Sequence, residues 1–376
     1  MLFRSLTAGW VVPSALAARL KLCCRATSSK VSSQDAGGSR RGADIMGAYG
    51  TISSGHLLTG RPSAQAQGRS HGQEGPSHPR EGTSLPARPN VLVVMADQLT
   101  PLALPFHADV PTRAPHMAAL AAEGVVFDAA YCNSPLCAPA RAVLMTGRLP
   151  SAIGAFDNAA ELPAELPTFA HALRLGGYRT ILSGKMHFCG ADQLHGFEER
   201  LTTDIYPADF GWTPDWDRPA ERQEWYHNMS SVLEAGTCVR TNQLDFDDEV
   251  VFAAERRLFE LVREPDRRPF LMVVSMTHPH DPFAIPAAYW DRYDPAEIPL
   301  PRVTLAEEAM DPHARRVRAA VELDHTPPTP AQIRAARHAY YGAISYVDDQ
   351  LGRLRQALAT TGLADSTVIV LLSDHG

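Results

Sequence analysis

Val91-Leu92-Val93-Val94-Met95-Ala96 is a short, continuous apolar run, and the polar pair Asp97-Gln98 follows it directly. A run of this length without alternation is typical of a strand buried on both faces, as in a parallel sheet with helices above and below it. Ligands of open α/β sheets bind outside the carboxyl ends of the strands. Asp97 and Gln98 therefore lie where a functional site is expected.

Further along the chain, helical patterns alternate with apolar runs. Helices are predicted over 114–123, 166–175, 244–262 and 330–361, and they precede apolar runs at 125–127, 178–182, 269–276 and 366–372. This order predicts an α/β fold in which a mostly parallel central sheet has helices on both faces.

The composition of the whole chain excludes some classes of protein. Its 376 residues are 45% hydrophobic, with a formal net charge of -7, so they can bury a large core or two domains but do not form a basic nucleic-acid binder. The six cysteines are unevenly spaced, which fits a reducing compartment better than a disulfide framework. No apolar run approaches the ~20 residues that a membrane-spanning helix needs.

The N-terminal quarter differs in composition from the rest. Residues 1–34 carry five basic side chains, no acidic one, and frequent Ser and Ala, which resembles an organellar targeting leader; a secretory leader and upstream sequence without a targeting role are the alternatives. Residues 35–87 are rich in Gly, Ser, Arg, Gln, Pro and His and are predicted to be a disordered linker. The folded catalytic domain is predicted over 88–376.

The stretch Asn133-Ser134-Pro135-Leu136-Cys137-Ala138-Pro139-Ala140-Arg141 places Pro two residues and Arg four residues after a cysteine. An apolar lead-in and a helical composition afterwards predict that Cys137 lies where a loop becomes a helix, with Pro139 in the first turn. Backbone N–H groups at such a helix start, with Arg141 one turn in, form an anion cradle beside the sulfur. A buried thiol without chemistry is the alternative for an isolated cysteine.

Three predicted strands end in side chains that can bind a metal or an anion. These ends are Asp97-Gln98, His278-Pro279-His280-Asp281-Pro282 and Ser373-Asp374-His375-Gly376. Asp97, Gln98 and Asp374 offer oxygen ligands. His375 adds one imidazole, and such a set suits a hard divalent cation such as Ca²⁺, Mg²⁺ or Mn²⁺. Single aspartates of this kind are more often caps, and the shared position after buried strands is what favours a metal site.

The stretch around Cys137 resembles the Cys-x-Pro-Ser-Arg signature of the type I sulfatases, with Ala140 where the family usually has Ser. The resemblance implies an alkaline phosphatase-like fold and the oxidation of Cys137 to formylglycine, the catalytic aldehyde, by a formylglycine-generating enzyme. It also implies a divalent cation, Ca²⁺ first and Mn²⁺ or Mg²⁺ as alternatives. The implied metal ligands are Asp97, Gln98, Cys137, Asp374 and His375, and Gln98 stands where the family usually has a second Asp.

Two further segments resemble sulfatase motifs. Gly184-Lys185-Met186-His187 looks like the family's Gly-Lys-x-His segment, which implies that Lys185 bridges the sulfate and that His187 contacts the formylglycine hydroxyl. His280 resembles the histidine that contacts the ester oxygen; His278 is the alternative, and Pro282, two residues after His280, favours His280. The implied catalytic set is Cys137, Arg141, Lys185, His187 and His280. Without the resemblance, the Lys-x-His pair would be read as solvated surface.

Longer blocks resemble the choline sulfatases, a branch of this family. They cover 133–141, 154–161, 184–187 and 192–214, within a resemblance that runs from about Arg88 to Gly376. The resemblance implies hydrolysis of choline sulfate and a choline pocket that includes Asn158, Trp212 and His227. An aromatic face suits a quaternary ammonium, which cannot donate hydrogen bonds; without the resemblance, Trp212 is a core or interface aromatic.

Two alternative functions stay open. A phosphoester or phosphonate hydrolase of the same superfamily could use the same anion cradle. The family continues beyond the position of Gly376 with a lysine segment and a carboxyl-terminal subdomain, so an inactive fragment lacking the carboxyl-terminal part is the other expectation. For a longer form the resemblance implies a homo-oligomer. It also implies a cytoplasmic location, whereas the basic leader favours an organellar or secretory location.

Overall fold

The computed structural model describes residues 10–12, 88–218, 221–223 and 226–376. The predicted leader, apart from Trp10–Val12, and the whole predicted linker at 35–87 lie outside the described residues. The fold below is that of the described residues.

A mostly parallel sheet of seven strands forms the centre of the described region, in the order β3-β1-β9-β2-β7-β4-β5. Its parallel strands are β9 (Thr367–Ser373), β2 (Asn90–Ala96), β7 (Phe270–Met276), β4 (Arg179–Gly184) and β5 (Glu199–Arg200). Two short strands extend the sheet at one side: β1 (Trp10–Val12) pairs antiparallel with β9, and β3 (Val125–Phe127) pairs antiparallel with β1. The predicted run at 125–127 is therefore a strand; it runs in the same direction as β9 but is separated from it by the antiparallel β1.

The register of the parallel strands brings their carboxyl ends together. Ala96 of β2 pairs with Met276 of β7 on one side and with Ser373 of β9 on the other, and Gly184 of β4 pairs with Ser275 of β7. Because these strands are parallel and end at nearly the same level, the residues that follow them leave the sheet at one edge.

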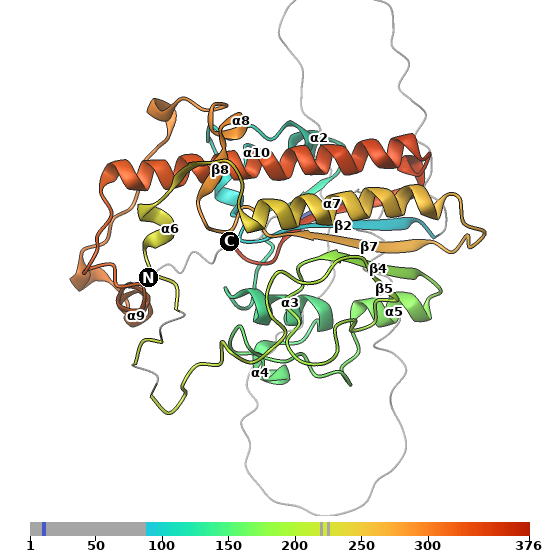
Figure 1. Cartoon of the computed structure of the whole chain (residues 1–376), viewed down its shortest axis with the longest axis horizontal. Coiled ribbons are helices and arrows are strands. Elements are labelled where there is room, and N and C mark those ends of the chain that lie inside the picture. The colour runs from blue at the N-terminus through green and yellow to red at the C-terminus, as the bar shows by residue number, and fades with distance from the viewer. Residues whose placement is uncertain (1–9, 13–87, 219–220, 224–225) are drawn as a thin grey trace, which may run out of the picture. The chain divides into compact units, whose positions relative to one another are not determined.

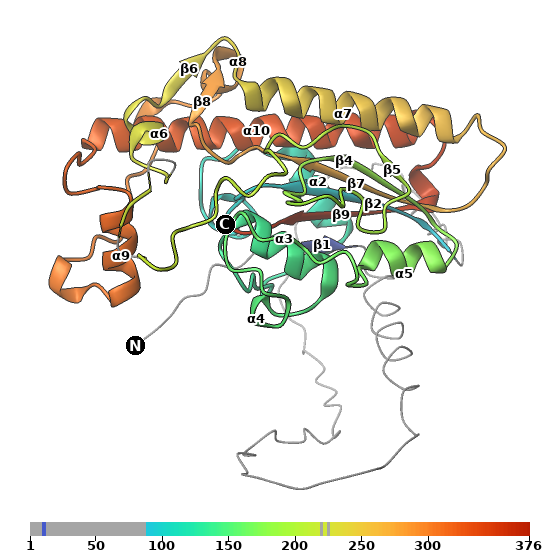
Figure 2. The same ribbon diagram turned by 60° about the horizontal axis from the view of Figure 1, so that its bottom comes forward.

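Helices cover both faces of the sheet, as predicted (Figures 1 and 2). One face carries α2 (Pro115–Glu123), α7 (Asn242–Leu261) and α10 (Pro330–Thr360). The other face carries α3 (Cys137–Thr146), α4 (Pro150–Ile153) and α5 (Phe169–Leu175). Among the described residues, no helix combines the length and the apolarity that a membrane span needs.

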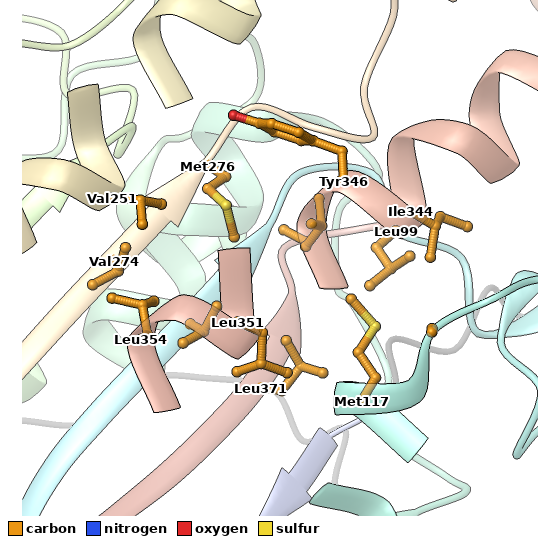
Figure 3. Close-up of a cluster of buried hydrophobic side chains, with 14 of the residues drawn as sticks. Leu99, Met117, Val251, Val274, Met276, Ile344, Tyr346, Leu351, Leu354 and Leu371 are labelled. Carbon is orange, nitrogen blue, oxygen red and sulfur yellow. The ribbon is translucent and has the colours of Figure 1, made fainter. Parts of the chain in front are cut away.

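The buried core consists of one apolar layer on each side of the sheet. Along β7, Met272 and Val274 pack toward α7 and α10, whereas Leu271 and Val273 pack toward α3 and α5. Figure 3 shows the first layer, in which Leu351 and other side chains of α10 meet strands β7 and β9. Each fully buried aliphatic side chain contributes roughly 1.5–3 kcal/mol. This two-sided burial explains why the strands read as continuous apolar runs.

Several boundaries and connecting elements differ from the prediction. Helix α5 begins at Phe169 rather than at 166, because Pro167 disfavours helix before it and the Thr168 side chain caps the helix by accepting the His171 N–H. Strands β6 (Gly236–Cys238) and β8 (Ala284–Pro286) pair in a separate small sheet. The remaining elements are α6 (Ser230–Leu233), α8 (Ala287–Trp290), α9 (Pro312–Ala320) and the 3-10 helices η1 (Pro101–Ala103), η2 (Pro295–Glu297), η3 (Glu307–Ala309) and η4 (Ala364–Ser366).

Candidate active site

Cys137 is the first residue of helix α3, so the predicted change from loop to helix at this cysteine is confirmed. The preceding residue, Leu136, has no side chain that can cap the helix, and Asn158 supplies a substitute from the next loop: its Oδ1 accepts the Ala138 N–H at 3.1 Å. The cysteine is buried, with 4% of its surface exposed. Asn158, which was predicted to belong to the substrate pocket, thus caps the start of the helix that carries the thiol.

The thiol lies among the side chains that end strands β2 and β9. Asp97, Cys137, Asp374 and His375 are all buried and place ligand atoms within 4.8 Å of one another. Cys137 Sγ is 3.3 Å from His375 Nε2 and 3.5 Å from Asp97 Oδ1. Gln98 is half-buried and takes part through its backbone N–H, which donates to Asp374 Oδ1 at 3.1 Å.

Two buried cations balance the two carboxylates of this cluster. Lys185 Nζ donates to Asp97 Oδ2 and lies 3.5 Å from Cys137 Sγ. Arg141 donates through Nε to Asp374 Oδ2 at 2.8 Å, and through Nη1 to Ser275 Oγ at 2.9 Å and to the Lys185 carbonyl oxygen. Charges this deeply buried are tolerated in proteins when they are paired and hydrogen-bonded in this way.

The charges of the cluster favour an ionised carboxylate and an ionised thiol. Burial on its own would raise the pKa of Asp97, but the Lys185 ammonium, followed by His280 and Arg141, holds that pKa well below its usual range. Burial and the Asp97 carboxylate would raise the pKa of the Cys137 thiol. The Lys185 ammonium, followed by the nearby imidazoles of His187 and His280, outweighs them, so the thiol pKa is strongly lowered.

The two histidines that follow strand β7 have different surroundings. His278 is turned away from the cluster, because its Nδ1 lies 2.7 Å from Oδ2 of the buried Asp247 on α7 and its ring packs edge-on against Tyr346. The His280 imidazole helps to lower the pKa of the Cys137 thiol, and its Nδ1 lies 2.8 Å from the Asp281 carbonyl oxygen. Burial would lower the pKa of His280, but Asp97, Asp281 and the thiol raise it well above its usual value.

His187 lies between the cluster and a pair of aromatic side chains. Its ring is 4.8 Å from that of Tyr206 and 5.6 Å from that of Trp212, and these two rings are 4.9 Å apart. The imidazole approaches the thiol, yet neither ring nitrogen makes a well-aligned hydrogen bond to a described residue. Lys185 Nζ also lies over the Tyr206 ring, 4.4 Å from its centroid.

His227 is the predicted site residue that lies farthest out. Its side chain is 70% exposed, its Nδ1 is 3.9 Å from Asp281 Oδ2, and its ring centroid is 5.9 Å from that of His280. The structure thus places it at the solvent side of His280, not against the buried cluster.

Three residues of the site were not singled out from the sequence: Asp204, Tyr206 and Asp247. Tyr206 completes the aromatic pair with Trp212, and the two aspartates bind backbone N–H groups of the loops that carry the site. Asp204 and Tyr206 lie in the block 192–214, where the resemblance could have drawn attention to them. Asp247 lies on a helix, and nothing in its sequence surroundings marks it.

The model of the Sulfatase family matches residues 89–376, which includes every residue of this cluster. The chain belongs to the sulfatase family. The predicted recognition and fold are therefore confirmed at the level of the family.

This sulfatase is similar to several named proteins. It is 48% identical over 294 residues to a choline-sulfatase of Rhizobium meliloti (strain 1021), a match that covers 77% of this chain and 57% of that protein. Identity to human iduronate 2-sulfatase is 27%, over 76% of this chain and 54% of the relative. The sulfatase described here thus spans little more than half the length of these relatives.

Among solved structures, the fold is similar to a phosphonate monoester hydrolase of Agrobacterium radiobacter. The TM-score is 0.60 with 26% sequence identity, and the match covers 77% of this chain and 63% of that one. The likeness supports the α/β fold with its parallel sheet.

The cluster of this sulfatase fits a divalent cation by the chemistry of its donors. Asp97 and Asp374 supply carboxylate oxygens and His375 one imidazole, the type of ligand set that hard cations accept. The buried Arg141 Nη2 lies 3.6 Å from Asp97 Oδ2 and has no hydrogen-bond partner among the described residues. An anion bound beside the cation would give this guanidinium nitrogen its missing acceptor.

Proposed function

We propose that this chain carries the catalytic centre of a hydrolase that cleaves choline sulfate into choline and sulfate. The observation that supports the proposal best is the position of Cys137, buried at a helix start between the carboxylate of Asp97 and the ammonium of Lys185. A cysteine in such a cluster suits a nucleophile and a metal ligand better than a packing role. The 48% identity to a choline-sulfatase supports the choice of ester.

The proposal includes the conversion of Cys137 to formylglycine and one divalent cation, with Ca²⁺ expected first. Asp97, Asp374 and His375 would hold the cation together with the converted residue, and Gln98 stays a predicted further ligand. When they are bound, the hydrated aldehyde supplies a hydroxyl nucleophile and the cation supplies Lewis-acid polarisation.

The chain's own side chains bind the sulfate group and assist the departure of choline. Arg141 and Lys185 are fixed cations beside Cys137, so they can neutralise charge on the sulfate oxygens. Choline leaves as a basic alkoxide unless it is protonated, and His280 is placed to supply that proton. His187, on the loop after strand β4, can take up the proton of the nucleophilic hydroxyl.

The aromatic pair Tyr206 and Trp212 gives the site a face suited to a quaternary ammonium. Its rings lie next to His187, on the side of the site formed by the block 192–214. A methylated ammonium near an aromatic face gains roughly 0.5–2 kcal/mol. Asn158 and His227 are included in the proposed choline pocket, although the side-chain Oδ1 of Asn158 already caps helix α3.

The second candidate is hydrolysis of a phosphonate or phosphate ester. It is favoured by the likeness to a phosphonate monoester hydrolase, and tetrahedral phosphorus and sulfur esters present similar anionic oxygens to a buried cation pair. An inactive fragment is the remaining alternative, because the chain spans only 57% of its choline-sulfatase relative.

Two measurements on one protein sample test these alternatives. The chain is produced together with a formylglycine-generating enzyme, and mass spectrometry of the peptide containing Cys137 determines whether the thiol has become an aldehyde. The converted protein is loaded with Ca²⁺ or Mn²⁺ and assayed with choline sulfate, an aryl sulfate and a phosphonate monoester. We expect conversion and a preference for choline sulfate, and no activity in Cys137→Ala but full activity in the matched control Cys238→Ala.

Each other result selects another alternative. A preference for the phosphonate ester favours the second candidate, and a converted protein without any activity favours the inactive fragment. An unconverted thiol combined with wild-type activity in Cys137→Ala would overturn the formylglycine proposal. The predicted cytoplasmic location and the predicted homo-oligomer of a longer form are tested separately, by fractionation of the source cells and by light scattering.

A further inference from the structure

We propose that Asp204 is a positioning residue that holds the segment Lys185-Met186-His187 in its active geometry. The inference rests on the proposed function, since it concerns how that site is assembled. Asp204 Oδ2 accepts two successive backbone N–H groups, that of Met186 at 2.9 Å and that of His187 at 2.8 Å. Its side chain is 5% exposed, so these bonds are made with little competition from water.

The segment needs such an anchor because of its backbone conformation. His187 has φ of 57°, in the left-handed region that residues other than glycine rarely occupy. Such a conformation persists only when the surrounding structure imposes it. The N–H of this strained residue and that of Met186 before it both point at one carboxylate oxygen, and we therefore assign to Asp204 the role of imposing the conformation.

The carboxylate is itself fixed from its own segment. Arg200 Nη2 donates to the same Asp204 Oδ2 at 3.0 Å, and Arg200 Nη1 donates to Gln193 Oε1 at 2.7 Å. Thr202 Oγ1 accepts the Gly184 N–H at 2.9 Å, one residue before Lys185. The short stretch 202–204 therefore accepts three backbone N–H groups, one from the last residue of strand β4 and two from the segment that follows it. This segment carries Lys185 and His187.

The same stretch also leads into the proposed choline face. Tyr206 is two residues after Asp204, and its ring packs on the His187 ring at 4.8 Å. Asp204 thus sets the distance between the sulfate end of the site, marked by Lys185, and the aromatic end. A residue with this function affects the rate more than the affinity, because a small displacement of catalytic groups is costly in the transition state.

The test compares two substitutions at Asp204 in the full chain, converted by a formylglycine-generating enzyme and loaded with Ca²⁺. Asp204→Ala removes the acceptor, and we expect kcat for choline sulfate to fall about 100-fold while KM changes less than about threefold. Asp204→Asn keeps an acceptor oxygen but loses the charge, and we expect it to restore kcat to within about fivefold of the wild type. Asp209→Asn is the matched control, because Asp209 is exposed in the same block and bonds the N–H of its own loop at Gly211.

If Asp204 only stabilises the fold, the two variants should behave differently from this expectation. In that case both Asp204 variants lose activity in proportion to the loss of folded protein, measured by circular dichroism, and kcat per folded molecule stays at the wild-type value. That result, or wild-type kcat in Asp204→Ala, overturns the proposal.

A crystal structure separates this inference from the proposed function. If the unsubstituted chain hydrolyses no choline sulfate, the proposed function fails, and the backbone of Asp204→Ala then decides the positioning role on its own. We expect His187 to leave the left-handed region in Asp204→Ala and to keep it in Asp204→Asn. An unchanged His187 backbone in Asp204→Ala overturns the inference whatever the substrate is.

Discussion

The Arg141 guanidinium donates through Nε to the Asp374 carboxylate at 2.8 Å, although 233 positions separate the two residues in the chain. The bond joins a residue one turn into helix α3 to the residue that follows strand β9, and both side chains are almost completely buried. It therefore connects the helix that begins at Cys137 to the carboxyl edge of the sheet. Two charges in this position stabilise each other only as a pair, since neither can be solvated alone.

Arg141→Ala should lower the free energy of unfolding by about 3–5 kcal/mol, because it leaves buried carboxylates without their cation. Urea unfolding monitored by circular dichroism measures the change. Arg141→Lys keeps the charge but cannot contact Asp374, Ser275 and the Lys185 carbonyl at once, so we expect an intermediate loss. Arg148→Ala, on the exposed loop after the same helix, is the control and should unfold as the wild type does. Wild-type stability in Arg141→Ala would show that the pair is not needed for folding.

The sequence predicted the parts of the site that depend on strand ends. The sequence predicts that Asp97 and Asp374 belong to one site, because each follows an apolar run that is typical of a buried parallel strand. Parallel strands end at the same edge of a sheet. Arg141 and Lys185 were assigned through motifs, since an Arg in a helix or a Lys on a loop has no pattern that distinguishes it from a surface charge.

The residues that hold the site's loops could not be predicted in the same way. Asp204 and Asp247 act by accepting backbone N–H groups of distant segments, Met186 and His187 in one case and Thr277 and His278 in the other. Such contacts depend on the path of the loops and not on periodicity or composition. The pairing of β3 with β1 was missed for a related reason, because three apolar residues do not specify which strand lies beside them.

Removal of the divalent cation should lower both activity and stability. Asp97 and Asp374 lie side by side in the cluster, and a bound cation would relieve their mutual repulsion. At a cation concentration 100 times Kd, binding to the folded state alone adds about 2.7 kcal/mol to the free energy of unfolding. Thermal unfolding after chelation and after readdition of Ca²⁺ or Mn²⁺ measures this. Asp374→Asn should lose most of the shift, and the exposed Asp365→Asn should keep it. An equal shift in both variants would place the cation elsewhere.

Stability at acid pH should depend on Glu264, which lies far from the site in a network of ion pairs. Hydrogen bonds from Arg257 and then Arg179 lower the pKa of Glu264 from 4.5 to about 2. Because the folded-state pKa is the lower one, the contribution is present above pH 4.5 and disappears as the pH falls toward 2. Glu264→Gln should therefore show a smaller decrease in stability over this interval, in urea unfolding at a series of pH values. The exposed Glu165→Gln should retain the wild-type slope, and high salt should weaken the effect because Glu264 is open to solvent.

Selection of a quaternary ammonium should depend on Trp212, whose ring lies 4.9 Å from that of Tyr206 and 5.6 Å from that of His187. Trp212→Ala should raise KM for choline sulfate about 10-fold or more, because the cationic head group loses an aromatic face. The ester 3,3-dimethylbutyl sulfate keeps the anionic sulfate and the shape of the head group but lacks the positive charge, so its KM should change much less. Trp216→Ala is the matched control, because Trp216 is 60% exposed four residues later in the same segment. Equal increases in KM for both esters in Trp212→Ala would mean that Trp212 contributes only apolar contact and that another group recognises the ammonium.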